Sequence, residues 1–402
     1  MTNTKRRFEL FSFFDHTGIS THLEQMAWDG WMLDKISNFG WVYRKIEPKA
    51  IHFAVSYYPK ASEFDPEPSE EQKIFHEFCA HTGWKLACTS AQIQIFYNEQ
   101  ENPVPIETEP ELELASIHAS AKKSLILTHV LLLGISFMQA GLFISGLLGD
   151  PIGLLSSPSR LFVGFCALLL FLLCITELGC YFLWYKKAKT AVSHGEFLKT
   201  PNTTTFQRII VGAVLTCGLY WMVNFILGGD SLRRWVGIFM CIYMPALFLI
   251  VNGTKNYLKR KKVSKKMNFC ITMLVDFVLA FSLMGIITFL ILSASSKGFF
   301  AERDEETYEH NGITWILHKD ELPLTIEDLT GLTYDGYIKE QRGDESLLLG
   351  QWTYKQRPRF DLENYLDLPH LTYTAVYVKF PPLYDLCKNL FLEKEKEDLV
   401  IA

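Results

Sequence analysis

The sequence predicts an α+β domain of two tandem β-α-β-β units, an α-helical membrane bundle after it, and a small α+β domain at the end. Three observations predict this order. A pattern Ala-x-x-Gly-Trp-x-Leu occurs twice near the N-terminus, apolar stretches fill the middle of the 402-residue chain, and strand-like patterns return after them. The predicted parts are a first domain over 1–107, a helical linker over 108–123, a membrane region over 124–294 and a last domain over 298–402.

The two copies of the repeated pattern each follow a helix-like run. Gly30 and Gly83 stand where a helix commonly ends on a left-handed glycine, and Trp31 and Trp84 follow as apolar residues that fold back on the last turn. The two glycines lie 83 − 30 = 53 residues apart. We therefore predict two structural helix caps, with a paired ligand site as the alternative.

Each helix has a predicted start. Thr21-x-x-Glu24 and Ser69-x-x-Gln72 have the spacing of a capping box, in which a hydroxyl and an acid or amide satisfy free amides of the first turn.

Strand-like runs complete each unit. They are FELFSFF, WMLDKI and GWVYRKI around the first helix, and IHFAVSYY, WKLACT and IQIFYN around the second. Two such units predict one sheet with both helices on one face.

Five apolar stretches approach the roughly 20 residues that a helix needs to cross a bilayer. They cover about 124–148, 161–185, 209–228, 235–252 and 269–294. The loops after the second and fourth stretches are rich in lysine, and KNYLKRKKVSKK is the richest. Because cationic loops stay on the cytoplasmic side, we expect a plasma membrane protein with a cytoplasmic N-terminus and an extracytoplasmic C-terminus. The first residues also lack the apolar core of a signal peptide.

The lysine-rich loop KNYLKRKKVSKK is expected to be a topology anchor, with binding of anionic lipid headgroups as an added role.

The last domain is predicted from the strand-like runs ITWILHK, YIKEQRG, SLLLGQWTYKQ and LTYTAVYVKF and from a final helix in PLYDLCKNLFLEKEKE. Of the nine cysteines, this orientation places only Cys387 outside, so no intrachain disulfide is expected there.

Motifs of common chemistry are absent from the sequence. It has no phosphate loop, zinc helix, nucleophile elbow or kinase signature, and no cofactor or metal is predicted. Asp15-His16 and His52 are isolated, and a general-base histidine needs an oriented partner that sequence alone does not reveal.

Three ionisable residues fall within the predicted spans. His129, Glu177 and Asp276 would lie in the inner half of the bilayer on three different helices. Such residues usually face a bundle interior, a cavity or each other. We predict one polar cluster, either structural with protonated acids or a proton- or cation-responsive site.

Several stretches resemble a known family of bacterial membrane proteins. They are FFDHTGISTHLEQMAWDGWML, RKIEPKAIHFAVSYYPKASEFD, GWKLACTSAQIQIFYNEQENPVPIET and the late PPLYDLCKNLF. The family carries the domain-of-unknown-function label 2812. The resemblance implies a Gram-positive plasma membrane protein, often encoded beside a winged-helix regulator of the phenolic-acid-repressor type, and it brings no catalytic residues.

These observations favour a non-enzymatic membrane sensor or regulatory protein that relays a membrane or surface signal to the cytoplasm. The alternative is a component of a transport or export system, although transporters usually show paired repeats and broken helices. The expected partners are the lipid bilayer and a cytoplasmic regulatory protein, without direct binding of nucleic acid.

Overall fold

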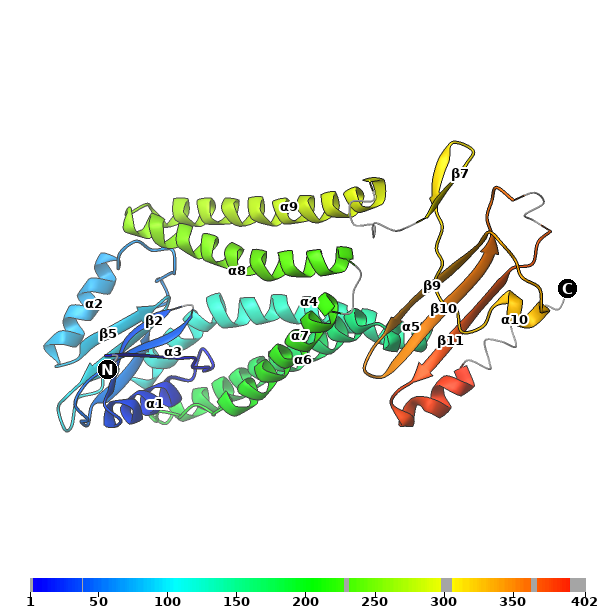
Figure 1. The fold of residues 1–402 in the computed structure, drawn as a ribbon. Coiled ribbons are helices and arrows are strands. Elements are labelled where there is room, and N and C mark those ends of the chain that lie inside the picture. The colour runs from blue at the N-terminus through cyan, green and yellow to red at the C-terminus, as the bar shows by residue number, and fades with distance from the viewer. Residues whose placement is uncertain (1–2, 38, 228–230, 298–305, 363–366, 391–402) are drawn as a thin grey trace. The chain divides into compact units, whose positions relative to one another are not determined.

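The computed structural model describes residues 3–37, 39–227, 231–297, 306–362 and 367–390 (Figure 1). The chain divides into two compact units, which are described separately. The first comprises Met1–Phe137, Leu168–Thr216 and Met240–Gly285, and the second comprises Met138–Ala167, Cys217–Phe239 and Ile286–Ala402.

The N-terminal part of the first unit alternates strands and helices. Its elements are β1 (Thr4–Arg7), α1 (His16–Trp28), β2 (Trp31–Ser37), β3 (Gly40–Lys45), β4 (His52–Tyr57), α2 (Glu70–His81), β5 (Lys85–Ser90) and β6 (Ile93–Asn98). The strands form two antiparallel sheets, in the orders β1-β3-β2 and β4-β6-β5.

The prediction that both units pair their strands into one sheet is therefore wrong, because the strands form two separate hydrogen-bonded sheets. β2 and β5 are edge strands of separate ladders, and each carries a register shift, between Leu33 and Lys35 in one and between Leu86 and Cys88 in the other. A bulge of this kind bends an edge strand and interrupts regular pairing beyond it.

Two local predictions in this region are also wrong. The run FELFSFF is not a strand, because β1 ends at Arg7 and the chain from Phe8 to Asp15 has no regular structure. The first helix begins at His16 rather than near Thr21, because the Asp15 side chain accepts the Gly18 amide at 2.9 Å and caps it. Ser69 does cap α2, accepting the Gln72 amide at 3.2 Å.

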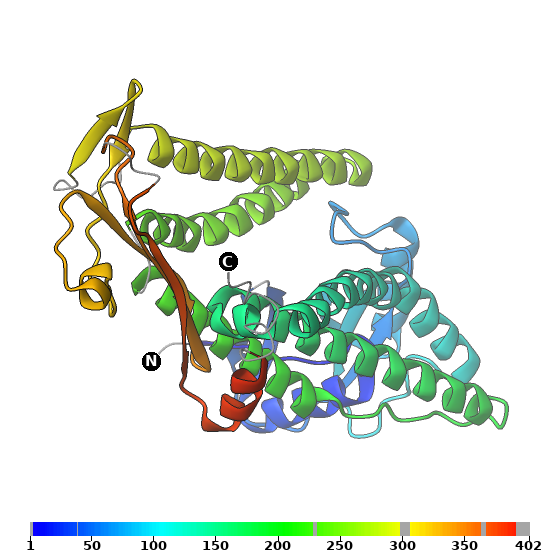
Figure 2. The same cartoon turned by 90° about the vertical axis from the view of Figure 1, so that its right-hand side faces the viewer.

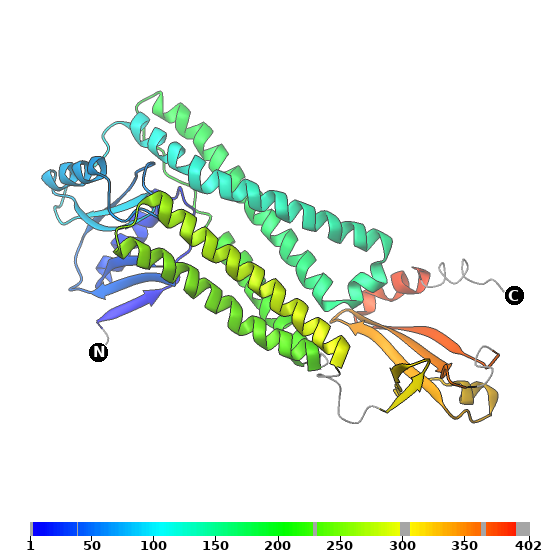
Figure 3. The same ribbon diagram turned by 90° about the horizontal axis from the view of Figure 1, so that it is seen from above.

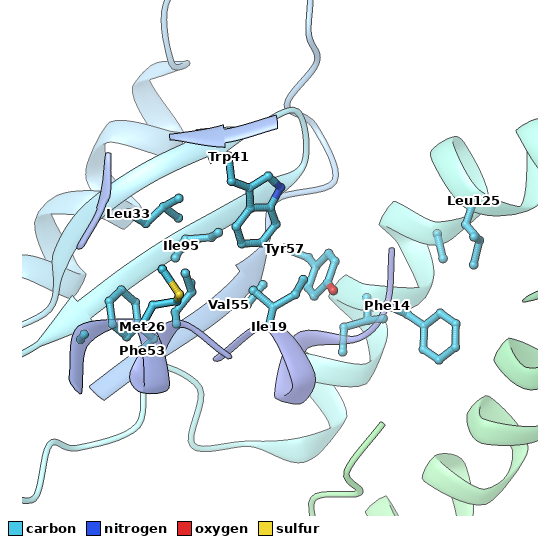
Figure 4. Close-up of a cluster of buried hydrophobic side chains, with 14 of the residues drawn as sticks. Phe14, Ile19, Met26, Leu33, Trp41, Phe53, Val55, Tyr57, Ile95 and Leu125 are labelled. Atoms are coloured by element: carbon cyan, nitrogen blue, oxygen red, sulfur yellow. The ribbon is translucent and has the colours of Figure 1, made fainter. Parts of the chain in front are cut away.

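The apolar face of α1 covers strands of both sheets. Figure 4 shows Ile19 and Met26 of α1 facing Phe53 and Val55 of β4. The same buried cluster continues beyond the domain into two long helices, through Leu114, Ile117, Tyr181, Trp184 and Ala188. The N-terminal domain and the ends of these helices next to it therefore share one hydrophobic core.

Five helices of the described chain are long and apolar enough to cross a membrane, which confirms a multi-pass membrane protein. Helix α3 (Pro110–Ala121) passes through a π-helical turn, η1 (Lys122–Ile126), into α4 (Leu127–Gly149), and the others are α6 (Pro158–Val192), α7 (Thr204–Leu227), α8 (Ser231–Arg260) and α9 (Lys265–Lys297). Helices α8 and α9 run side by side (Figure 3), and the Tyr243 hydroxyl donates to the Leu279 carbonyl at 2.6 Å.

The second unit contains a C-terminal sheet. Its elements are α5 (Pro151–Ser156), β7 (Thr307–His310), β8 (Ile313–Ile316), α10 (Ile326–Thr330), β9 (Tyr337–Glu345), β10 (Leu349–Pro358), β11 (Leu371–Val378) and η2 (Pro381–Leu383). Strands β11-β10-β9 form one antiparallel sheet (Figure 2), and Ile152 of α5 packs with Leu349 and Cys387. The sequence did not predict α5, β7 or α10. The predicted final helix is present over 384–390, and its remainder lies outside the described residues.

Candidate functional site

The chain between β1 and α1, Phe8–Asp15, joins the N-terminal domain to the membrane helices of the first unit, and we call it the junction segment. The Tyr57 hydroxyl of β4 donates to the Phe13 carbonyl at 2.7 Å. On its other side the segment contacts α6, α7 and the connection between them. It is therefore held from both directions.

Glu177 of α6 is the centre of a buried polar cluster at this segment. The Ser12 hydroxyl donates to the two carboxylate oxygens at 2.9 and 3.1 Å, and the Thr203 hydroxyl donates at 3.2 Å. Gln207 also donates to Glu177, and to Ser12 at 2.8 Å. Glu177 is only 4 % exposed and has no ion pair with any described residue. Neutral donors alone satisfy this carboxyl group.

Local structure explains why these donors converge. Gln207 lies in the first turn of α7 and Thr203 directly before it, so both side chains project from one helix start. The connection before α7 is fixed to α1 as well, because Thr200 donates to the capping carboxylate of Asp15 at 2.5 Å and its amide donates to Thr17 at 3.1 Å. The polar cluster thus depends on two segments, one before α1 and one before α7.

A charged network binds the same two regions. The Glu9 side chain, 2 % exposed, pairs with Arg7 at 3.1 Å, with His22 of α1 at 3.2 Å and with Arg208 of α7 at 3.3 Å. Burial lowers the pKa of His22, and the nearby Glu9 charge partly offsets that effect. A buried carboxylate with cationic partners on two elements ties them together, because removal of a partner leaves its charge uncompensated.

Aromatic packing completes the junction. The Phe14 ring lies 5.3 Å from the ring of Tyr181 and 5.4 Å from that of Trp184, both on α6. His118 of α3 contacts the Tyr181 hydroxyl at 2.7 Å and stacks on Tyr185 at 4.2 Å. One face of the last turns of α6 is therefore packed against protein.

A cavity of about 450 Å³ lies beside the polar cluster. Glu177, Gln207 and Ser12 line it together with His129 of α4. His129 uses its Nδ1 atom to contact the Leu125 carbonyl of its own helix at 2.8 Å. Two of the three ionisable residues that the sequence grouped, His129 and Glu177, thus share one cavity wall.

The third residue of that group is elsewhere. Asp276 lies on α9, is half-buried, and does not line this cavity. The structure instead surrounds Glu177 with Ser12, Thr203 and Gln207, none of which the sequence had indicated. No sequence signal could have identified Ser12, because it comes from a segment that the pattern assigns to a strand.

The π-helical turn that precedes α4 is docked on the N-terminal domain. The Ser124 hydroxyl donates to the Gln92 side chain at 2.7 Å, and the Lys123 ammonium donates to the Pro59 carbonyl at 2.9 Å. Turns of this type are frequent at functional sites. The hydrogen bonds of Ser124 and Lys123 give α4 a second fixed contact with the domain.

The isolated histidines of the sequence both line a separate groove of about 610 Å³. His16 lies 3.5 Å from the Glu113 carboxylate, and His52 lies 3.7 Å from that of Glu24. Burial lowers the pKa of His16, with smaller opposing contributions from the Phe14 carbonyl and the Asp15 charge.

Glu107 is a further acid of this groove. One of its oxygens accepts from Ser56 at 2.6 Å, and the other is buried without a hydrogen-bond partner in the described chain. Burial raises the pKa of Glu107. Within the described residues, no three histidine, cysteine or acidic side chains are placed to hold a metal ion.

The glycines of the repeated pattern have left-handed backbone conformations. Gly30 has φ of +81° and Gly83 has φ of +89°. The amide of Trp84 returns to the Cys79 carbonyl at 3.0 Å, as in a helix C-cap. The Trp84 ring is buried with Cys79, and its indole nitrogen donates to Val104 at 2.7 Å, whereas Trp31 is half-buried beneath the Lys5 ammonium.

Comparison with known proteins adds one finding. No curated protein and no solved structure matches the chain. The model of the family described as "Protein of unknown function (DUF2812)" matches residues 17–129, a range that runs from α1 to the first turn of α4. Residues 17–129 of the chain therefore carry the region that defines the DUF2812 family.

Proposed function

We propose that this chain is a non-enzymatic sensor or regulatory membrane protein, in which the membrane helices and the N-terminal domain change state together. The observation that carries the proposal is the buried contact of Glu177 on α6 with Ser12 of the junction segment. A motion of α6 or α7 would separate donors from a buried carboxyl group, which is costly unless the junction segment follows. A coupled two-state element of this kind is what a relay requires.

The proposed orientation has the N-terminal domain in the cytoplasm and the C-terminal sheet outside. Lysines concentrate in the last turns of α6 and α8 and in the connections that follow them, which supports this assignment. A soluble regulatory protein is then the proposed partner of the N-terminal domain, and the C-terminal domain would meet extracytoplasmic signals.

We also propose that the N-terminal domain is an internal duplication of a β-α-β-β unit. Two features support it at one spacing. The left-handed glycines are 83 − 30 = 53 residues apart, and the register shifts at Leu33/Lys35 and Leu86/Cys88 are separated by 86 − 33 = 53 and 88 − 35 = 53. Equivalent bulges at equivalent positions are typical of units that share an origin.

The test of the relay is Glu177→Gln in the full chain, in lipid nanodiscs. Glutamine keeps the size of the side chain but offers one acceptor atom and turns an NH₂ group toward donors. We expect faster backbone hydrogen exchange in the junction segment and in the first turn of α1, with unchanged exchange in β4 and β6.

Asp276→Asn is the matched control, since it makes the same chemical change on α9, away from the cavity. Unchanged exchange in Glu177→Gln would contradict the relay. A proton flux in proteoliposomes that Glu177→Gln abolishes would favour the transport alternative instead.

A further inference from the structure

The turn between α8 and α9 is strongly cationic, together with the helix ends on either side of it. From Lys255 to Lys266 the chain has seven Lys and Arg residues and no acid, and we call this stretch the cationic hairpin. It joins two helices that are long and apolar enough to cross a membrane, so it lies at a bilayer surface.

An acidic loop of the N-terminal domain is docked on this hairpin. The loop is Glu63–Glu67, between β4 and α2, and three of its carboxylates form ion pairs: Lys255–Glu63 at 2.9 Å, Lys265–Asp65 at 3.4 Å and Lys262–Glu67 at 2.6 Å. The three acids of the loop thus neutralise about half of the positive charge of the hairpin.

Uncharged contacts fix the geometry of this docking. The side-chain amide of Asn268, fully buried, donates to the Phe64 carbonyl at 3.1 Å, and the rings of Phe64 and Phe269 meet edge to face at 5.2 Å. The Ser62 amide donates to the Asp65 carboxylate at 2.7 Å, so the loop is ordered by the same acid that pairs with Lys265.

Two of the three ion pairs are largely exposed, whereas in the third the Lys255 side chain is only 14 % accessible and that of Glu63 is 58 % accessible. The side chains of Lys262 and Glu67 are 73 % and 50 % accessible, and those of Lys265 and Asp65 are 48 % and 26 % accessible. Exposed ion pairs of this kind are weak and screened by salt. The attraction of a basic residue to an anionic membrane surface is of comparable size.

Three further cations of the hairpin are exposed and form no ion pair with a described residue. They are Arg260, Lys261 and Lys266. The docked acids do not occupy them, so they remain available to phosphate groups of the bilayer.

We propose that the cationic hairpin is a binding surface for anionic lipid headgroups, and that these lipids compete with the acidic loop for it. In a neutral bilayer the loop stays docked. In an anionic bilayer the hairpin turns to the lipid phosphates and the acidic loop is released toward α2. This competition makes the N-terminal domain responsive to membrane surface charge, and it does not depend on the relay through Glu177.

The test uses the full chain in nanodiscs of phosphatidylcholine, with and without phosphatidylglycerol. Hydrogen exchange of the backbone at Glu63–Glu67 is the readout, and that of β6 is the internal reference. We expect exchange in the loop to rise by about tenfold with phosphatidylglycerol, as expected when its three ion pairs are lost. Inorganic phosphate added to phosphatidylcholine nanodiscs should not reproduce the rise.

Two variants complete the test. Arg260→Gln/Lys261→Gln/Lys266→Gln should keep the loop docked in phosphatidylcholine and lose most of the response, while four cations remain to hold the topology. Glu63→Gln/Asp65→Asn/Glu67→Gln should show fast exchange in both lipids. A wild-type loop that exchanges equally in both lipids, or a response that survives in the first variant, would overturn the proposal. Glu177→Gln should leave the lipid response intact, so failure of the relay and failure of this inference are distinguishable.

Discussion

The Ser12 hydroxyl and the Glu177 carboxylate are 165 residues apart in the sequence and 2.9 Å apart in the fold. Both side chains are buried, and no cation pairs with Glu177 among the described residues. The contact links the segment before α1 with the middle of α6. Its energetic weight comes from burial, since an acceptor that loses its donors away from water cannot regain them from solvent.

Ser12→Ala should lower the free energy of unfolding of the N-terminal domain by about 1–3 kcal/mol, because a buried carboxyl group then loses one of its donors. Ser193→Ala is the control, since that exposed hydroxyl donates within its own helix end, to Thr190 at 2.7 Å. Labelling of the buried Cys79 thiol under denaturant, quantified on its peptide, measures both. Equal stability of the two variants would show that the contact is dispensable.

Valine at Gly30 or Gly83 should destabilise the domain by about 1 kcal/mol or more, since a β-branched residue resists a positive φ. An added Cβ at Gly30 would also lie 3.1 Å from the Ile46 carbonyl. Gly179→Ala is a useful contrast, because that glycine is helical with open space around it, and alanine favours a helix. The cap interpretation fails if the thiol of Cys79 is equally protected in all three variants.

The sequence predicted the features that depend on local pattern. The five apolar helices, the end of α1 at Gly30 and the capping of α2 by Ser69 each follow from neighbouring residues. The helix from Pro110 into the membrane was also expected. What local pattern did not reveal is that Leu114 and Ile117 of this helix belong to the domain core.

The junction escaped prediction because its partners are distant in the chain. The run FELFSFF resembles a strand, yet polar residues of Phe8–Asp15 bond to α7, to the connection before it and to α6. The sequence shows Glu177 and His129 as unusual residues in apolar stretches, but it could not identify the hydrogen-bond donors of Glu177, because these come from distant segments. Asp276 was grouped with them by depth alone, and depth along a helix does not fix the face on which a residue lies.

External protease on intact cells or protoplasts should cut the chain after α9 and leave the N-terminal domain intact, if the loop charges set the orientation as proposed. Peptides from 306–390 should be released while those from α1 to β6 stay protected until the membrane is permeabilised. The reverse pattern would place the N-terminal domain outside. It would leave the Glu177 contact unchanged but invalidate the proposed cytoplasmic partner.

The pH dependence of stability should reveal two buried groups with opposite signs. The folded state lowers the pKa of His16 below 6.5, so the unfolded chain binds more protons there and stability falls as the pH falls below 6.5. The folded state raises the pKa of Glu107 above 4.5, so the folded chain holds a proton that the unfolded chain has lost, and stability falls as the pH rises through that raised value. The two effects partly cancel in the wild-type protein.

Variants separate these two contributions. As the pH falls below 6.5, His16→Gln should lose less stability than the wild type, because its side chain no longer titrates. Glu107→Gln should gain stability relative to the wild type as the pH rises above 4.5. Cys79 labelling in the full chain measures both slopes, with His81→Gln, an exposed position at the end of α2, as the control. Slopes for His16→Gln and Glu107→Gln that match the control would mean that neither group is buried as the structure has it, and the groove would then be open to water in solution.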